Sequence, residues 1–123
     1  TSWNALSADG LLEAYEAIGA EEYKEMGLKI VDFLTDRMTE EDGRMYRTYA
    51  KGERKINAFL DDYAFVIKLY IKLFQVSAEK QWLTLANEIT KYVMKHFFDE
   101  ESGMFFYTNK KIRCDLQRKR GIE

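Results

Sequence analysis

Apolar side chains recur along this chain at intervals of three and four residues, a spacing that places them on one face of an α-helix. Four stretches show this period, at about residues 2–18, 21–38, 58–76 and 78–98. The stripe is clearest in the second stretch, where it consists of Tyr23, Met26, Ile30, Leu34 and Met38. The chain contains no proline, which suits long uninterrupted helices. The pattern predicts an all-α fold made of two antiparallel helical hairpins.

Short extended segments are predicted after the second and fourth helices. The sequence EEDGRMYRTYAKGERKI follows the second helix, and its Asp42-Gly43 pair is a turn signal. Residues 45–49 then alternate as a strand does, and a basic loop follows them. After the fourth helix, DEESGMFFYTNKK repeats this pattern. Each helical hairpin is therefore expected to end in a short extended piece.

These likenesses form one internal repeat. Shifting the sequence so that Tyr23 falls on Trp82 superimposes the apolar stripe of the second helix on that of the fourth. We call this constant shift the repeat offset. It also places Met26 on Leu85, Ile30 on Ile89 and Leu34 on Val93. With one inserted residue, Gly43 falls on Gly103. The chain reads as two copies of one unit, at about 1–57 and 58–108, followed by a basic tail at 109–123. Because such repeats bury their faces against neighbours, more copies are expected in the natural protein.

Composition narrows the possible partners. The 123 residues suit one domain, and 46% hydrophobic residues suffice for a packed core. A net charge of −2 favours neither nucleic acid nor an anionic membrane as a partner. No run approaches the roughly 18 apolar residues that span a bilayer. The only cysteine, Cys114, fits a reducing compartment, so a cytoplasmic protein is expected.

Metal and cofactor sites are not expected. His96 is the only histidine, and no second histidine or cysteine stands at ligand spacing. The sequence shows no glycine-rich phosphate loop, nucleophile elbow or Cys-x-x-Cys motif. Aromatic residues reach 15%, and they serve either as core or as the lining of sugar and peptide sites.

Three stretches, TSWNAL, DGRMYRTYAKGERKINAFLDDYAF and FFDEESGMFFYT, resemble the (α/α)6 toroid region of the spermatogenesis-associated protein 20 family. These are thioredoxin-domain-containing proteins whose toroid region is similar to N-acylglucosamine 2-epimerases and six-hairpin glycosidases. The resemblance covers about residues 1–108 and implies that the chain supplies two of six hairpins, with the remaining hairpins of the full-length protein as its partners. The first and third helices would line the central cavity. The thioredoxin-like domain lies outside these residues, and the tail does not resemble the family's continuation.

In such toroids the substrate cleft lies where the inner helices begin, together with the loops before them. The resemblance therefore implies ligand-binding roles for Trp3, Asn4, Arg47, Tyr49, Lys51, Asp61 and Tyr63, and it makes Asp62 the candidate catalytic residue. The aromatic residues of this set could stack on a sugar ring or pack in the core. Arg47 and Lys51 could hold an anionic ligand, although pairing with the neighbouring aspartates is favoured.

Asp62 has two interpretations. Two carboxylates at a suitable separation can perform acid–base chemistry on a glycosidic bond. Asp61 is a poor partner for Asp62, however, because adjacent helical side chains point about 100° apart, so a second carboxylate would lie outside this chain. The alternative is capping. Asn57 is a plausible N-cap of the third helix, and carboxylates in the first turn favour the positive end of the helix dipole.

Two functions follow from this sequence. The first is a toroid fragment that binds a carbohydrate-like ligand, with epimerase or glycosidase chemistry only in the full-length protein. The alternative is a helical-repeat module for protein interaction, without catalysis. Convergence of Trp3, Arg47 and Asp62 at one end of the helices would favour the first. Uncovered apolar helix faces also predict self-association.

Overall fold

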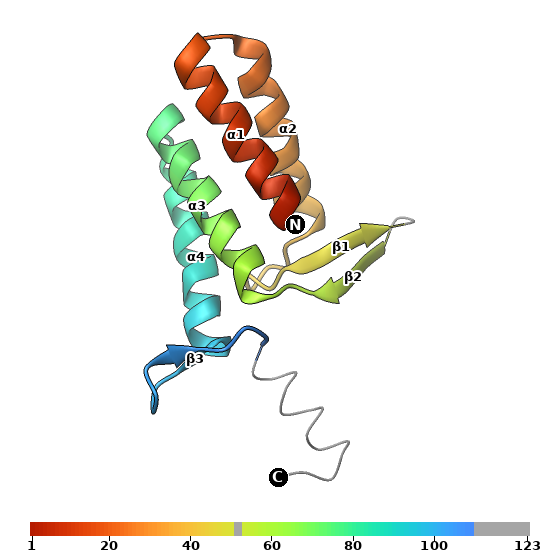
Figure 1. Cartoon of the computed structure of the whole chain (residues 1–123), viewed down its shortest axis with the longest axis vertical. Coiled ribbons are helices and arrows are strands. Elements are labelled where there is room, and N and C mark those ends of the chain that lie inside the picture. Colours follow the sequence, from red (N-terminus) through yellow and green to blue (C-terminus); the bar gives the residue numbers. More distant parts are fainter. Residues whose placement is uncertain (51–52, 110–123) are drawn as a thin grey trace.

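The computed structural model describes residues 1–50 and 53–109, and within them the chain forms two helical hairpins, each followed by a two-stranded sheet (Figure 1). The helices are α1 (Ser2–Ile18), α2 (Glu21–Arg37), α3 (Leu60–Ser77) and α4 (Lys80–His96). The strands are β1 (Tyr46–Ala50), β2 (Glu53–Asn57), β3 (Phe98–Asp99) and β4 (Met104–Phe105). The prediction of an all-α fold with short extended pieces after the second and fourth helices is confirmed.

The helix ends follow from local chemistry. Gly19 ends α1 in the left-handed conformation, with φ of 79°, and its N–H donates to the Tyr15 carbonyl at 2.7 Å. Ala78 repeats this cap at the end of α3, with φ of 59°. No described helix is both long and apolar enough to cross a membrane.

The start of α3 differs from the sequence prediction. Asn57 is the last residue of β2 rather than an N-cap, and its Oδ1 accepts hydrogen bonds from the Arg44 guanidinium. The Ala58 N–H still donates to the Met45 carbonyl at 3.0 Å, so the backbone remains extended past Asn57. The N-cap is Phe59. Pairing across the hairpin therefore delays the start of the helix.

The expected basic loop is a strand as well. β2 pairs antiparallel with β1, in a register that sets Tyr46 opposite Asn57 and Ala50 opposite Glu53. The alternation of residues that forms β1 was visible in the sequence. The charged residues of β2 give no such signal, because the stability of this strand comes from cross-strand pairing. This β-hairpin projects beside the N-terminal ends of α1 and α3 (Figure 1).

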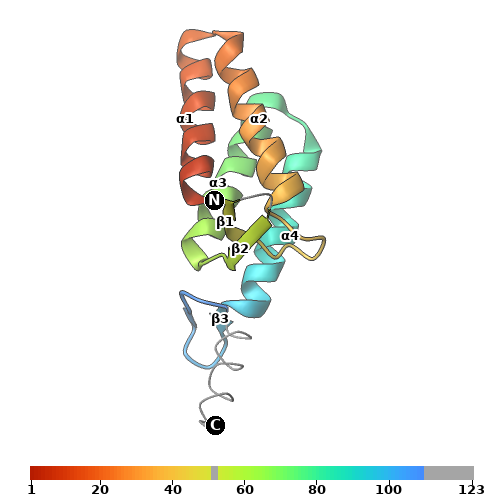
Figure 2. The ribbon, with the colours of Figure 1, turned by 90° about the vertical axis from the view of Figure 1, so that its right-hand side faces the viewer.

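The two helical hairpins share one core. α1 packs against α3, and this contact joins the first hairpin to the second (Figures 1 and 2). The Tyr70 ring of α3 stacks on Trp82 of α4 with 5.9 Å between centroids, and its hydroxyl hydrogen-bonds to Thr35 of α2 at 2.9 Å. Asn109, which the sequence analysis placed in the tail, is also buried and donates to the Tyr92 hydroxyl at 3.0 Å. The folded unit therefore extends at least to Asn109.

Candidate functional site

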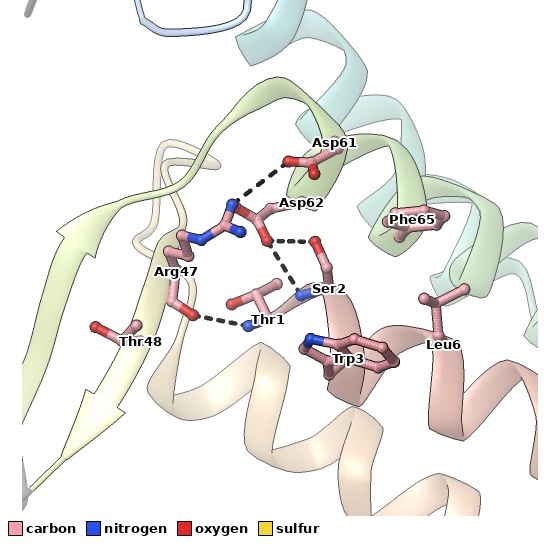
Figure 3. Close-up of a pocket in the computed structure, with 9 residues that line it drawn as sticks. All are labelled: Thr1, Ser2, Trp3, Leu6, Arg47, Thr48, Asp61, Asp62 and Phe65. Atoms are coloured by element: carbon pink, nitrogen blue, oxygen red, sulfur yellow. Dashed lines mark hydrogen bonds and ion pairs between the residues drawn. The ribbon is translucent and has the colours of Figure 1, made fainter.

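A cleft of about 330 Å³ opens between the N-terminal ends of α1 and α3, beside β1 (Figure 3). Residues of the first turns of both helices and of β1 line it: Thr1, Ser2, Trp3, Leu6, Arg47, Thr48, Asp61, Asp62 and Phe65. Because helix N-termini carry unpaired N–H groups and a partial positive charge, this end of the bundle favours carboxylates.

Asp62 joins the N-terminal ends of α1 and α3. Its carboxylate has no exposed surface and accepts from the Phe59 N–H at 2.9 Å, which caps α3. The same carboxylate accepts from Ser2 of α1, through the backbone N–H at 3.1 Å and the hydroxyl at 2.5 Å. The structure therefore supports the capping interpretation of Asp62, and extends it to a second helix. A side chain so enclosed has no surface with which to contact a substrate, which argues against the catalytic role.

Arg47 reaches from β1 over both aspartates. Its Nη1 lies 3.3 Å from Asp62 Oδ2 and 3.6 Å from Asp61 Oδ1. The guanidinium also lies over the Phe59 ring, 4.7 Å from its centroid, which fixes its plane. About a third of the Arg47 side chain remains exposed. The predicted pairing of Arg47 with the aspartates is confirmed, and donors remain available on its exposed edge.

Asp61 is the accessible carboxylate of the cleft. Its side chain is 40% exposed, in contrast to that of Asp62. Its contacts are long: the Tyr107 hydroxyl donates to Oδ2 at 3.4 Å, and Oδ1 has the 3.6 Å ion pair with Arg47 but no hydrogen bond among the described residues. Because Oδ1 is buried, the exposed part of the carboxylate that a ligand could reach is Oδ2.

One side of the cleft is apolar. Trp3 is 83% exposed, and its indole lies at the α1 edge, while Leu6 and Phe65 form the side farther from Arg47 (Figure 3). Sequence analysis did not select Leu6 or Phe65 as site residues. The signal for them was the repeat itself, because the repeat offset superimposes Leu6 on Phe65.

Four of the eight predicted site residues meet in this cleft, namely Trp3, Arg47, Asp61 and Asp62. Asn4 is exposed but does not line it. Tyr49 lies elsewhere: its ring contacts Phe33 edge-on at 5.2 Å, and its hydroxyl accepts from Arg37 at 3.4 Å. Lys51 lies outside the described residues.

Tyr63 is a core residue, so its expected ligand contact is wrong. The side chain is 1% exposed, stacks on Tyr92 with 5.6 Å between centroids, and accepts a hydrogen bond at its hydroxyl from the Met45 N–H at 2.8 Å. Burial raises the pKa of Tyr63 well above that of a solvated phenol. Tyr63 sits one residue after Asp62, and the helix turns it towards α4 instead of the cleft.

Tyr63→Phe is expected to lower the free energy of unfolding by about 1–3 kcal/mol, because it leaves the buried Met45 N–H unpaired. Urea unfolding followed by circular dichroism measures this change. Tyr107→Phe is the control, since that hydroxyl is exposed and makes only a 3.4 Å contact, and it should cost less than about 0.5 kcal/mol. Equal costs for the two variants would contradict the structural role of the Tyr63 hydroxyl.

Within the described part of the chain, no three His, Cys, Asp or Glu side chains are grouped so that they could hold a metal ion. His96 packs its ring against Tyr92, with 4.2 Å between centroids.

No protein-family model matches the chain. Spermatogenesis-associated protein 20 of Rattus norvegicus is 29% identical over 124 residues, an alignment that covers 94% of this chain and 16% of that protein. The similarity inferred from the sequence is therefore confirmed by curated relatives. The chain spans about one sixth of the length of these relatives.

Solved structures share the fold. A protein of Listeria innocua superimposes with a TM-score of 0.74 at 20% identity, over 83% of this chain and 30% of that one. Cellobiose 2-epimerase from Bacillus thermoamylovorans gives 0.73 at 14% identity, over 85% and 30%. A glycoside hydrolase family 76 mannosidase from Bacteroides thetaiotaomicron gives 0.65 at 17% identity, over 84% and 31%. The chain is thus a segment of an (α/α)6 toroid fold.

Proposed function

We propose that this chain supplies two adjacent hairpins of a six-hairpin toroid, and that the cleft between α1 and α3 is part of a carbohydrate-binding site in the full-length protein. The observation that carries the proposal is the meeting of Trp3, Arg47 and Asp61 in one cleft at the starts of the inner helices. An aromatic face matches the C–H face of a pyranose, and charged side chains satisfy its hydroxyl groups. Two proteins with similar folds are named as an epimerase of cellobiose and a mannosidase, which agrees with this ligand class.

Each residue of the cleft would have a different role in binding the ligand. Trp3 would stack on a sugar ring, Asp61 would accept hydrogen bonds from its hydroxyls, and Arg47 would donate to its oxygens. Asp62 would hold the two helices in place without touching the ligand. Epimerase or hydrolase chemistry requires positioned acids and bases, which the remaining hairpins would supply. The isolated chain would therefore bind without turnover.

The setting of the full-length protein is part of the proposal. We expect the remaining hairpins, and a thioredoxin-like domain, in the same polypeptide, as the similarity to spermatogenesis-associated protein 20 suggests. The single cysteine of this chain, Cys114, is consistent with a cytoplasmic location.

The two tryptophans allow a direct binding test. Trp3 is 83% exposed at the cleft, whereas Trp82 is 8% exposed and packs on Tyr70, so the indole N–H signals in an NMR spectrum report the cleft and the core separately. Titration with cellobiose, mannose and N-acetylglucosamine is expected to move the Trp3 signal and to leave that of Trp82 in place. At least one sugar should produce a saturable shift, in the millimolar range that a partial site allows.

Two variants complete the test. Asp61→Asn keeps the size of the side chain but removes its charge, and it should weaken the sugar affinity by about tenfold, the loss of one charge-assisted hydrogen bond. Met26→Ala changes an exposed apolar residue of α2 outside the cleft and should leave the affinity unchanged. If none of the sugars moves the Trp3 signal of the folded chain, the proposal is wrong for these two hairpins.

A helical-repeat interaction module is the second candidate function. The observation that favours it is an open apolar groove between α3 and α4, on the face of the second hairpin that points away from α1.

A further inference from the structure

Tyr107 reaches the rim of the cleft from the segment that follows β4. Its hydroxyl donates to Asp61 Oδ2 at 3.4 Å, and its ring stacks on Phe59 with 4.9 Å between centroids. The Phe59 ring also supports the Arg47 guanidinium, which lies 4.7 Å from its centroid. One aromatic ring at the start of α3 therefore holds two side chains that reach Asp61.

The internal repeat makes Tyr107 the counterpart of Arg47. The repeat offset, with its one inserted residue, places Arg47 on Tyr107. The backbone shows the same equivalence. The Thr1 nitrogen donates to the Arg47 carbonyl at 2.7 Å, and the N–H of Leu60, the counterpart of Thr1, donates to the Tyr107 carbonyl at 2.8 Å. Each unit therefore fastens this position to the start of its own first helix, and both side chains turn towards Asp61.

The two oxygens of Asp61 face different residues of the rim. Oδ1 is buried and lies 3.6 Å from the Arg47 guanidinium, whereas Oδ2 receives the Tyr107 hydroxyl. Because the exposed part of this carboxylate is Oδ2, a ligand hydroxyl group that donates to Asp61 binds the same oxygen as Tyr107. The accessible acceptor of the cleft therefore has a phenol beside it.

The contact between Tyr107 and Asp61 is weak enough to be exchanged for a ligand. A hydroxyl group that donates to a carboxylate usually lies at about 2.5–2.7 Å from it, so the 3.4 Å contact is long. A neutral phenol can donate and accept, whereas the guanidinium of Arg47 only donates. Adjacent hydroxyl groups of a sugar match this pair, since one donates to Oδ2 while its neighbour bonds to the phenol.

We propose that Tyr107 is a ligand-contacting specificity residue of the sugar site, and that Tyr107 and Asp61 together bind two adjacent hydroxyl groups of a pyranose. This inference rests on the proposed carbohydrate site and names the feature of the sugar that the site selects. Asp61, Tyr107 and the Phe59 ring that supports them all lie in the second repeat unit. The contact is therefore complete within the described residues.

Tyr107→Phe tests the proposal, because it removes the hydroxyl and keeps the ring on Phe59. NMR titration of the Trp3 indole signal with cellobiose, mannose and N-acetylglucosamine gives the affinities. The variant should bind the tightest of these sugars about fivefold more weakly, the loss of one hydrogen bond, and should keep the urea unfolding midpoint of the wild type. Tyr15→Phe is the matched control. Its hydroxyl also donates to a carboxylate at 3.4 Å, that of Glu21, but at the far end of α1, so the affinity should not change.

Monodeoxy analogues of the tightest-binding sugar, one for each hydroxyl group, identify the contact. One analogue should bind the wild type about fivefold more weakly than the parent sugar, yet bind Tyr107→Phe as well as the parent does, because the same contact is already lost. An unchanged affinity in Tyr107→Phe, or losses that add for every analogue, would overturn this inference and leave the carbohydrate site standing on the wild-type response of Trp3. If none of the three sugars moves the Trp3 signal of the wild type, both proposals are wrong.

Discussion

Asp62→Ala is expected to lower the free energy of unfolding by about 3–5 kcal/mol, a large fraction of the stability of a small domain. The substitution removes the acceptor of the Phe59 N–H, and the loss of a cap costs about 1 kcal/mol. It also leaves the Ser2 N–H and hydroxyl without their acceptor, at about 1–3 kcal/mol for each donor that stays buried. The ion pair between Asp62 and Arg47 is lost as well.

Urea unfolding of three variants checks this expectation. Asp61→Ala is the matched control, because its carboxylate is 40% exposed and weakly held, and it should cost less than about 1 kcal/mol. Asp62→Asn should fall between the two, since the amide keeps one acceptor oxygen but turns a donor towards N–H groups. It also serves as the test if Asp62→Ala does not fold. Similar stabilities for Asp61→Ala and Asp62→Ala would show that Asp62 does not join the two helices.

The helices could be predicted because their signal is local. The apolar period placed α1 at Ser2–Ile18, as the structure has it, and placed the end of α2 next to Arg37, its last residue. The predicted start of α3 was wrong because Asn57 has a strong intrinsic preference for the N-cap position. The pairing of β1 with β2 overrides that preference. Cross-strand pairing depends on residues that are distant in the sequence, and a hydrophobic pattern does not record it.

Only part of the candidate site could be predicted, again because some of its contacts join residues that are distant in the sequence. Charged residues near a helix start are visible in the sequence, so Arg47 and the two aspartates were found. The sequence did not show how Asp61 and Asp62 divide their roles. That division depends on Ser2, which is distant in the sequence and converts Asp62 into a shared cap. The resemblance placed Tyr63 in the cleft, but Tyr63 is one residue after Asp62, so the helical rotation of about 100° turns its side chain into the core.

The repeat has diverged at the mouth of the cleft. Under the repeat offset, Asp61 and Asp62 correspond to Ser2 and Trp3. α3 therefore carries its own carboxylate cap, whereas α1 has none at the corresponding position and uses that of α3. One copy of the unit supplies the carboxylates and the other the exposed indole. A cleft with two different walls results from two similar hairpins.

Gly43→Ala is expected to lower the free energy of unfolding by about 2–3 kcal/mol, from two separate causes. Gly43 has φ of 98°, a conformation that residues with a Cβ rarely adopt. A Cβ at this position would also lie 3.2 Å from the Cβ of Tyr92 and 3.4 Å from the Glu88 carbonyl oxygen, both on α4. The turn therefore packs directly on the second hairpin, and it sets the position of β1 and of Arg47.

The internal repeat provides the control for this variant. Gly103 is the counterpart of Gly43 and also has a positive φ, 72°, but a Cβ there meets no described atom within 4 Å. Gly103→Ala should therefore incur only the backbone cost, about 1 kcal/mol. The difference between the two variants, measured by urea unfolding, isolates the contact of the first turn with α4. If the two glycines prove equally costly to replace, that contact contributes nothing. The placement of Arg47 over the cleft would then depend on its contacts with the two aspartates and with the Phe59 ring.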